Sequence, residues 1–411
     1  MAVLLRGANL WDGLTDKPAG PRDILVDADR IAAIGAKLTA PPDTQVIDLS
    51  GHTVTPGFMD CHTHVTVTPD LVSALTLSPT AVALRSLATL RTLLLNGFTT
   101  IRDLMGADPG FSVLDLRDAI ATGKIVGPRM LVAPHLISAR GGHGDFSAIL
   151  DANLQGPHRV LEMAAADGED EIRTRVRQEI RAGADWIKFG ATGGFSSPSD
   201  DPSHTTYSQE EMNILVATAK DLGRPATPHC YGAEGIKRAV RAGVRSIEHG
   251  NLANATSLQM MTDHGVFLIP TQFTVLQDAR HVDDDEFWAG KPAFKRRKFH
   301  QHHKTLLDGA DLIAASEVRI AFGTDAGMFP HAENWREFPA MVSNGITPVR
   351  ALRAATSVAA ELLGLDDLGV LAKGKIADIV AMPGDPFADI EVTGKVDFVM
   401  KEGVVYAEPS E

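Results

Sequence analysis

The chain has 411 residues, of which 44% are apolar, and a formal net charge of −13. A chain of this length can bury a large core, either in two or three domains or in one large α/β barrel. The acidic balance argues against nucleic acid or an anionic membrane surface as partner and favours small molecules. With only two cysteines, Cys61 and Cys230, a disulfide scaffold is excluded and a reducing compartment is allowed.

The N-terminal residues do not have the pattern of an export signal. Arg6 follows too few apolar residues to leave a signal-peptide core, and no uncharged apolar run reaches membrane-spanning length. We therefore expect a cytoplasmic protein without a membrane partner. A chain from which an export signal had been removed would look the same.

The two ends of the chain have the alternating pattern of short β-strands. Residues 1–52 alternate apolar and polar side chains between Gly, Asp and Pro, which indicates antiparallel strands. The segments 377–382 and 396–406 have the same character. We predict that both ends together form a small β-sandwich domain, residues 1–52 plus 370–411.

Residues 53–369 alternate apolar strands with helical segments, which is typical of parallel β/α units. About eight strands can be counted, the number that closes a TIM barrel. The predicted fold class is thus α/β, a distorted TIM (β/α)8 barrel that carries the terminal β-sandwich. The expected strands are 55–64, 97–103, 129–134, 186–190, 226–231, 246–249, 266–270 and 320–325.

Helix signals separate these strands. Ser208 and Glu211 form a capping box, and acidic residues at 169–171 begin a helix that Gly183 ends. Thr347 and the following proline begin a helix that we expect to run to Gly364. The charged segment 281–304 contains three closely spaced histidines among lysines and arginines, and we interpret it as a solvated helical face rather than a metal site.

The first barrel strand ends in a His-x-His pattern. Side chains in a strand alternate between its faces, so His62 and His64 point the same way, with Asp60 deeper on that face. Two imidazoles on one face can hold one metal ion, and imidazole suits zinc and similar metals. This pattern alone is weak, because two such histidines are often unrelated.

Four further polar residues follow the ends of later strands: Lys188, His229, His249 and Asp325. Each has an ordinary structural explanation, such as a lysine reaching solvent, a hydrogen-bonded core histidine or an aspartate capping a helix. The carboxyl ends of barrel strands meet at one rim, so the six residues together predict a binuclear metal site. Lysine cannot bind a cation as ammonium, but a neutral amine could add carbon dioxide and bridge two metals as a carbamate.

The order His-x-His, Lys, His, His, Asp resembles the amidohydrolase superfamily, in the subgroup whose carboxylated lysine bridges two metals. The segments 56–64, 323–327 and 375–380 are similar to its opening strand, its closing strand and its return to the small β-domain. The resemblance implies two Zn²⁺ ions, with N6-carboxylysine at Lys188 as the bridge. His62, His64 and Asp325 would then hold the more buried ion, and His229 and His249 the more exposed one. A metal-bridging hydroxide would attack, and Asp325 would serve as general base and then acid.

Two residues are expected to contact the substrate. Tyr231 shares strand parity with His229 and should face the site, whereas Cys230 should face the helices. His143 lies in a glycine-rich loop after the third strand that could reach over the metals, although an exposed loop histidine or a packed tyrosine is the simpler explanation of each.

A closer resemblance narrows the activity. The segments 142–144, 186–188, 229–232 and 247–250 resemble the prolidase-like (Xaa-Pro dipeptidase) amidohydrolases, among them the ochratoxin-degrading enzymes. This likeness gives His143 a catalytic role, and His143 and Tyr231 contact with the tetrahedral centre or the substrate carboxylate. It implies cleavage of N-acyl amino acids or dipeptides with a C-terminal carboxylate: ochratoxin A to ochratoxin alpha and phenylalanine, or Xaa-Pro dipeptides. It also implies a homo-oligomer, with an octamer among the assemblies it allows.

The sequence leaves two other functions open. One is an imidazolonepropionase-like cyclic amidohydrolase or a deaminase on the same scaffold, which Lys188 disfavours because the deaminases usually work with one metal and no bridging lysine. The other is a non-catalytic scaffold protein, which would be expected to have lost ligands, whereas all six positions are filled here. Stoichiometric metal in the purified protein would separate the last possibility from the enzymes.

Overall fold

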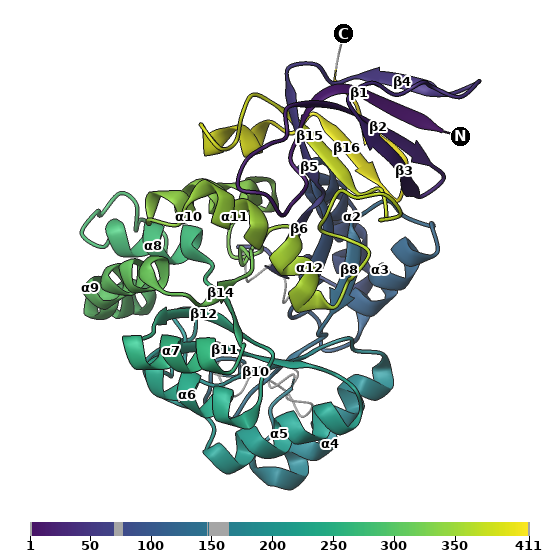
Figure 1. Ribbon diagram of the computed structural model, residues 1–411. Coiled ribbons are helices and arrows are strands. Elements are labelled where there is room, and N and C mark those ends of the chain that lie inside the picture. Colours follow the sequence, from purple (N-terminus) through teal and green to yellow (C-terminus); the bar gives the residue numbers. More distant parts are fainter. Residues whose placement is uncertain (1, 70–76, 146, 148–163, 410–411) are drawn as a thin grey trace.

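Strands from both ends of the chain lie together in one sheet at the top of Figure 1. The computed structural model describes residues 2–69, 77–145, 147 and 164–409. The sheet contains β1 (Val3–Leu10), β2 (Pro21–Asp27), β3 (Arg30–Gly35), β4 (Gln45–Asp48), β5 (His52–Pro56), β15 (Ile379–Pro383), β16 (Phe398–Lys401) and β17 (Val404–Ala407). Their order is β17-β16-β15-β5-β1-β2-β3, with β4 paired to β1. The predicted small β-domain from both termini is therefore confirmed, as one continuous hydrogen-bonded sheet.

Alternation along these strands gives the sheet an apolar core of its own. Leu5, Ile24, Ile379 and Phe398 come from four different strands and are fully buried in one cluster. The two chain ends meet where β5 pairs antiparallel with β15. The domain boundaries expected from the sequence, 1–52 and 370–411, stay a prediction. β5 pairs within the terminal sheet as far as Pro56.

The middle of the chain forms the predicted barrel. Its strands are β6 (Phe58–Thr63), β7 (Phe98–Asp103), β8 (Arg129–Val132), β9 (Leu136–Ile137), β10 (Ile187–Gly190), β11 (Ala226–Gly232), β12 (Ser246–Leu252), β13 (Phe267–Ile269) and β14 (Arg319–Ile320). They pair in parallel as two sheets, β6-β7-β8 and β9 through β14.

Two irregular junctions join these sheets into a closed barrel. The third barrel strand is split at Pro134, so that β8 pairs with β7 and β9 pairs with β10. A proline lacks the N–H that an uninterrupted ladder needs. On the other side, the Cys61 N–H donates to the Phe322 carbonyl at 2.8 Å, and Thr63 forms a parallel bridge with Ala326. Counting β8 and β9 as one position gives the eight positions of a TIM barrel, and the predicted fold class is confirmed.

Helices follow the strands and cover the outside of the barrel, with α4 to α7 around its lower part in Figure 1. They are α2 (Pro79–Leu95), α3 (Ser112–Ala121), α4 (Gly168–Ala182), α5 (Gln209–Asp221), α6 (Ala233–Ala242), α7 (Ala255–Asp263), α8 (Gln272–Arg280), α9 (Ala293–Ala315), α10 (Glu337–Ser343), α11 (Pro348–Ala354) and α12 (Ser357–Leu363), with 3-10 helices η4 (His331–Arg336) and η5 (Ile390–Lys395). The largest core cluster joins outward strand residues such as Phe189 and Ile247 to helix residues such as Ile236. The capping box of Ser208 and Glu211 at α5 is present.

One helix prediction is wrong. The expected helix from Thr347 to Gly364 is two helices, α11 and α12, with a break at Ala355 and Thr356. The carbonyl of Ala355 accepts from the N–H of Met59 on β6 at 2.8 Å, so a barrel strand uses an acceptor that a continuous helix would need. The Thr356 hydroxyl also donates to the Leu352 carbonyl at 2.7 Å, a local bond that competes with helix continuation.

The interpretation of segment 281–304 as a wholly solvated face is also wrong at one point. Lys298 of α9 is only 5% exposed and Phe299 beside it is 2% exposed, whereas His300 on the next position is exposed. The helix is amphipathic, and it turns Lys298 toward the barrel rather than toward water. What this lysine contacts is described below.

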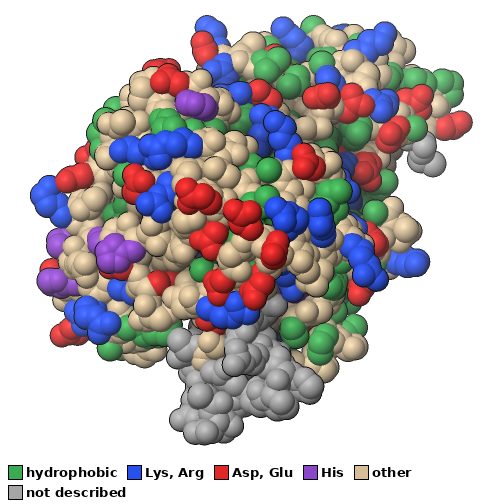
Figure 2. Space-filling model, turned by 90° about the horizontal axis from the view of Figure 1, so that it is seen from below, with side chains coloured by type: hydrophobic (Ala, Val, Ile, Leu, Met, Phe, Trp, Pro, Cys, Tyr) green, Lys and Arg blue, Asp and Glu red, His purple; other side chains and the backbone are tan. Residues whose placement is uncertain are grey.

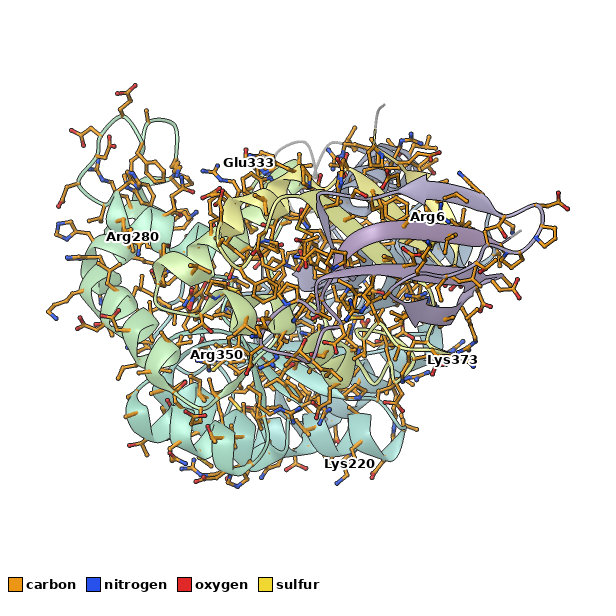
Figure 3. All side chains as sticks on the ribbon, turned by 45° about the horizontal axis from the view of Figure 1, so that its top comes forward. Arg6, Lys220, Arg280, Glu333, Arg350 and Lys373 are labelled. Atoms are coloured by element: carbon orange, nitrogen blue, oxygen red, sulfur yellow. The ribbon has the colours of Figure 1, made fainter. Side chains whose placement is uncertain are left out.

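The outer surface is charged with both signs. Acidic and basic side chains are interspersed over the face seen in Figure 2, and apolar atoms occur there in small groups. Lys220, Arg280 and Lys373, labelled near the outer edge in Figure 3, are all exposed. Among the described helices, none has both the length and the apolar character needed to cross a bilayer. Against this background, buried lysines such as Lys188 and Lys298 are exceptional.

Candidate metal centre

All six residues expected at the strand ends line one cavity of about 80 Å³. The cavity wall also includes the predicted substrate contacts. The members are His62, His64, Lys188, His229, His249 and Asp325, together with His143 and Tyr231. They come from strands on opposite sides of the barrel, and closure of the barrel brings them to one rim.

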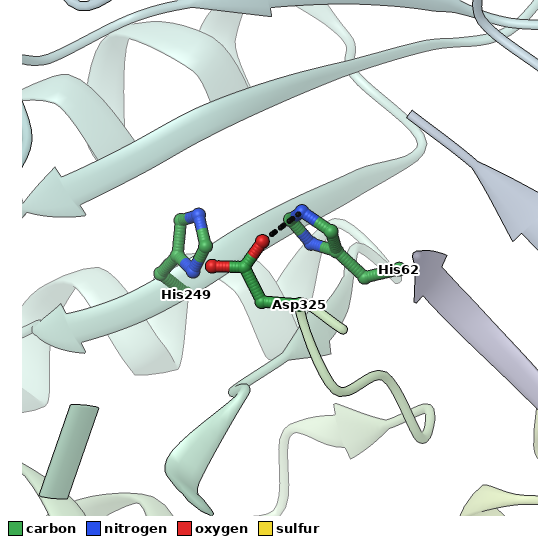
Figure 4. A group of neighbouring side chains, drawn as sticks. All are labelled: His62, His249 and Asp325. Carbon is green, nitrogen blue, oxygen red and sulfur yellow. Dashed lines mark ion pairs between the residues drawn. The ribbon is translucent and has the colours of Figure 1, made fainter. Parts of the chain in front are cut away.

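The first group at this cavity is formed by His62, His64 and Asp325. The Asp325 Oδ1 atom lies 3.0 Å from His64 Nε2 and 3.4 Å from His62 Nε2. Figure 4 shows the Asp325 carboxylate between the imidazoles of His62 and His249, and the ligand atoms of these three residues lie within 4.8 Å of one another. Imidazole and carboxylate donors this close can share a divalent ion such as zinc.

Buried hydrogen bonds fix the orientation of the two β6 histidines. His62 Nδ1 donates to Glu248 Oε2 at 2.9 Å, and His64 Nδ1 donates to the Met105 carbonyl at 3.2 Å. Glu248 is itself held by Arg102, whose Nη2 donates to Oε1 at 2.7 Å. With Nδ1 used in this way, Nε2 of each ring is the nitrogen left for a metal.

Asp60 supports the opposite side of this group. Its carboxylate accepts from the Thr324 hydroxyl at 2.7 Å and from the Thr324 N–H at 3.1 Å, which holds the turn that leads into Asp325. Burial raises the pKa of Asp60 to about 7, against these hydrogen bonds, which lower it. Asp60 therefore stabilises the turn that precedes Asp325, but it does not line the cavity.

Two of the candidate ligands have unusual backbone conformations. His249 has a φ of 72° and Asp325 a φ of 63°, in the left-handed region that few residues other than glycine adopt. Strand alternation puts Glu248 on the inward face of β12, so His249 would otherwise point outward. The left-handed turn instead directs the His249 imidazole into the cavity, next to Glu248. Strain of this kind often accompanies function.

The second group is formed by Lys188, His229 and His249. His249 Nδ1 lies 2.8 Å from the Thr271 hydroxyl oxygen, and His229 Nε2 donates to the Gly193 carbonyl at 3.3 Å. The Lys188 side chain is buried, and its Nζ has no hydrogen-bond partner in the part of the chain that the structure describes. An orphaned buried amine among metal-ligand side chains fits the carbamate that the sequence predicted.

The protonation states of His229 and His249 favour metal binding. Burial lowers the pKa of Lys188 to about 8 and that of His249 to about 3, and it holds the pKa of His229 well below its usual value. The imidazoles of His229 and His249 are therefore neutral near pH 7 and able to ligate. Burial acts to raise the pKa of Asp325, but the surrounding histidines outweigh it and hold the pKa below its usual range. For His64, the Asp325 carboxylate outweighs burial and raises the pKa.

The two predicted substrate contacts stack on candidate metal ligands. The His143 ring lies parallel to His229 with centroids 4.0 Å apart, and the Tyr231 ring lies parallel to His249 at 4.7 Å. Cys230 packs among the barrel helices in the main core, as the strand parity predicted. The rest of the cavity wall is mainly apolar: Val67, Leu104, Met105, Leu136, Phe195 and Met328, with Ser196. Such a wall suits an apolar substrate side chain.

Several residues that support the site are not evident from the sequence. Glu248 lies in the segment 247–250, but no role was predicted for it. It shares strand parity with Ser246 on β12, and this is the signal that could have placed it inside the barrel. Arg102 and Thr271 carry no such signal, because their roles depend on partners more than 100 and 20 positions away. The donor set as a whole, histidines and a carboxylate with an orphaned lysine, suits one or two divalent ions.

Known proteins share this architecture over the whole chain. The sequence profile of the amidohydrolase family matches residues 53–406. The chain is 30% identical to the ochratoxinase of Aspergillus niger over 411 aligned positions, which cover 94% of this chain and 83% of that protein. A solved Xaa-Pro dipeptidase with bound methionine in its active site is 34% identical with a TM-score of 0.91, covering 99% of this chain and 100% of the other. The solved A. niger ochratoxinase has a TM-score of 0.84 at 27% identity, covering 100% and 96%.

Proposed function

The chain belongs to the amidohydrolase family, and we propose that it hydrolyses the amide bond of N-acyl amino acids or dipeptides that end in a carboxylate. The family expected from the order of histidines, lysine and aspartate is confirmed by the match over residues 53–406. Ochratoxin A and Xaa-Pro dipeptides are the first substrates to test, because two similar proteins are an ochratoxinase and a Xaa-Pro dipeptidase.

One observation carries the proposal: six candidate metal ligands and two candidate substrate contacts line the same cavity. We propose that His62, His64 and Asp325 hold one divalent ion and that His229 and His249 hold a second. Lys188 would bridge them as N6-carboxylysine, for which its buried and unpartnered Nζ is the support. Zinc is the metal we propose, since imidazole and carboxylate donors suit it. When bound, such ions lower the pKa of a water molecule and polarise a carbonyl group.

The side chains around the cavity have distinct tasks in this proposal. The pKa of Asp325 is held below its usual range, so its carboxylate is ionised and can accept a proton from the attacking water. It would then deliver this proton to the nitrogen of the leaving amine. His143 and Tyr231, which line the same cavity, would bind the substrate carboxylate or the developing oxyanion. The apolar wall would exclude water and contact an apolar substrate side chain.

The test is a substrate panel with release of the amine as readout. It compares an N-acyl phenylalanine, an Xaa-Pro dipeptide, an Xaa-Phe dipeptide and ochratoxin A, each beside its C-terminally amidated form. We expect hydrolysis of at least one free-carboxylate substrate, with loss of activity on chelation and recovery on adding Zn²⁺.

Other outcomes would contradict the proposal. Turnover of a cyclic amide alone would favour the imidazolonepropionase-like alternative. Stoichiometric zinc with no turnover of any free-carboxylate amide would contradict the substrate class and leave the family assignment intact. The homo-oligomer stays a prediction, and light scattering of the purified protein measures it.

A further inference from the structure

We propose that Lys298 on α9 is a positioning residue that sets the His143 imidazole against His229 through Ser197 and Asp200. The predicted effect of Lys298 on turnover rests on the proposed function, whereas its effect on the position of the His143 ring does not. The contacts that carry it lie in the loop 193–200 after β10.

The ammonium group of Lys298 is buried and bonds only to the loop 193–200 among the described residues. Its Nζ donates to the Gly194 carbonyl at 2.7 Å, to the Ser197 carbonyl at 2.6 Å and to Asp200 Oδ1 at 2.9 Å. An ammonium group has three donors, and all three are used. Lys298 therefore does not bind a substrate carboxylate in this arrangement, and its charge serves to hold the loop 193–200 closed around it.

The chain of hydrogen bonds from Lys298 to His143 has a defined direction. Ser197 Oγ lies 2.5 Å from Asp200 Oδ1, and because a carboxylate only accepts, the serine hydroxyl must donate there. Ser197 has a single hydroxyl proton, so it can only accept from His143 Nδ1, which lies 2.8 Å away. His143 Nδ1 therefore carries a proton, and Nε2 is left as the ring nitrogen for the cavity, where it donates to a substrate oxygen only when it is protonated as well.

Asp200 has a second oxygen that supports this assignment. Asp200 Oδ2 is buried without a hydrogen-bond partner among the described residues, and it lies 3.9 Å from His143 Nδ1. A buried carboxylate beside a ring N–H stabilises that proton on Nδ1. Lys298 in turn compensates the charge of Asp200, since both side chains are buried. Without the lysine, the carboxylate would remain in the interior without a cation.

The loop also presses on the His143 ring directly. A Cβ atom added to Gly194 would lie 2.3 Å from His143 Cε1 and 2.9 Å from His229 Nε2, so only glycine allows the backbone this close. The neighbouring α9 residue Phe299 stacks on Phe195 at 4.1 Å, and Phe195 contacts the Tyr231 ring edge at 5.0 Å. Two adjacent residues of α9 thus reach the two proposed substrate contacts from behind.

Lys298→Met removes the three donors and keeps the length of the side chain. Loss of a supporting partner of this kind typically reduces activity about 10- to 100-fold. We expect a loss in that range in kcat/KM for the free-carboxylate substrate turned over in the panel, with zinc content unchanged. Lys304→Met is the matched control, because Lys304 lies on the same helix and pairs with Asp308 on its exposed face. The control should keep wild-type activity.

A double variant separates positioning from general destabilisation. If Lys298 acts through His143, then Lys298→Met should add no more than about 2-fold to the loss already caused by His143→Ala, because the shared interaction is gone. Multiplicative losses would overturn the proposal. Ser197→Ala should reproduce the defect and Ser197→Thr, which keeps the hydroxyl, should restore most of the activity. Equal defects in both serine variants would contradict the hydrogen-bond chain.

A crystal structure of zinc-loaded Lys298→Met tests the same idea without any substrate. The expected result is that the His143 ring leaves its parallel position on His229, with a centroid separation well above the 4.0 Å seen here. If the ring stays in place, the positioning role is wrong whatever the activity. If the ring moves but no amide is hydrolysed by the unmodified enzyme, the positioning role stands and the proposed function fails. Should Lys298→Met not fold, the structure of Ser197→Ala gives the same reading.

Discussion

The two halves of the cavity are built in different ways. On one half, His62, His64 and Asp325 contact one another, and buried partners hold both histidines. On the other half, Lys188 Nζ has no hydrogen-bond partner among the described residues, and His229 is held by one backbone carbonyl.

This difference shows which side chains of the cavity find their hydrogen-bond partners within the protein and which do not. The His62 half has its donors oriented by buried partners, and a metal ion would replace the proton that His64 shares with Asp325. The Lys188 half leaves a buried amine unsatisfied, a cost that a folded protein normally avoids. This is the half in which we propose a carbamate and metal ions to supply the missing contacts. Variants on the two halves should therefore fail in different ways.

The largest effect is expected for Lys188→Ala. Without the proposed bridge, at least one ion should be lost and kcat/KM should fall by about 10³-fold or more. Metal analysis and amine release measure both quantities. Lys220→Ala, on the exposed surface of α5, is the control. Added acetate or propionate should restore part of the activity, because a small carboxylate can replace the carbamate. Wild-type metal content and turnover in Lys188→Ala would contradict the comparison.

Glu248→Gln tests the preorganised half. The Gln side chain no longer accepts strongly from His62 Nδ1 and leaves Arg102 buried without a counter-charge. Metal affinity should fall about 10- to 100-fold, and the free energy of unfolding should decrease by about 3 kcal/mol. Calorimetric titration and urea denaturation measure these changes. Glu234→Gln, which breaks an exposed pair with Arg238, should change stability by less than about 0.5 kcal/mol.

Tyr231→Phe should have a smaller and more selective effect. The ring would still stack on His249, so metal content should stay the same. Loss of one hydrogen bond to a charged group should raise KM about 10-fold for substrates with a free carboxylate. The amidated substrates should be unaffected. Equal changes on both kinds of substrate would show that Tyr231 does not recognise the carboxylate.

The smallest effect concerns the structure behind His249. Glu337 accepts from the N–H groups of Gln272 and Phe273, next to Thr271, and burial raises its pKa from 4.5 to about 8. At Glu337 the folded state therefore binds more protons than the unfolded state between these pH values, so the contribution of Glu337 to the free energy of unfolding should decrease as pH rises from about 5 to 8.

Urea denaturation of the metal-free protein at several pH values measures this dependence. Asp60, whose pKa burial raises to about 7, contributes a slope of the same sign. The free energy of unfolding of the unmodified protein minus that of Glu337→Gln should therefore decrease as pH rises over this range. A Glu337→Gln protein with an unchanged slope would show that Glu337 is ionised throughout this range.

Local sequence patterns predicted the parts of the molecule that depend on local geometry. The period of two along β6 correctly placed His62 and His64 on one face, and the same rule separated Tyr231 from Cys230. The count of strands predicted the barrel, because eight parallel β/α units are the number that closes a TIM barrel. Charged residues at a strand end were informative for the same reason.

The rest depended on contacts that sequence spacing does not contain. Strand parity alone would turn His249 away from the cavity, and only its left-handed backbone brings it in. Lys298 stands in a run of basic residues, and its burial is decided by the loop 193–200, about 100 positions earlier. The break between α11 and α12 depends on the Met59 N–H, which β6 presents to the Ala355 carbonyl.

The passage from the terminal sheet to the barrel has a practical consequence. Only Gly57 separates β5 of the sheet from β6, and a Cβ atom at that glycine would lie 2.3 Å from the Thr99 hydroxyl. The Gly57 N–H donates to the Asp378 carbonyl at 2.8 Å, so the C-terminal part of the chain also holds the connection between β5 and β6. His62 and His64 follow Gly57 by only five and seven residues, so trimming or exchanging the terminal strands would displace both side chains. The terminal sheet therefore has to be redesigned together with the residues that line the cavity.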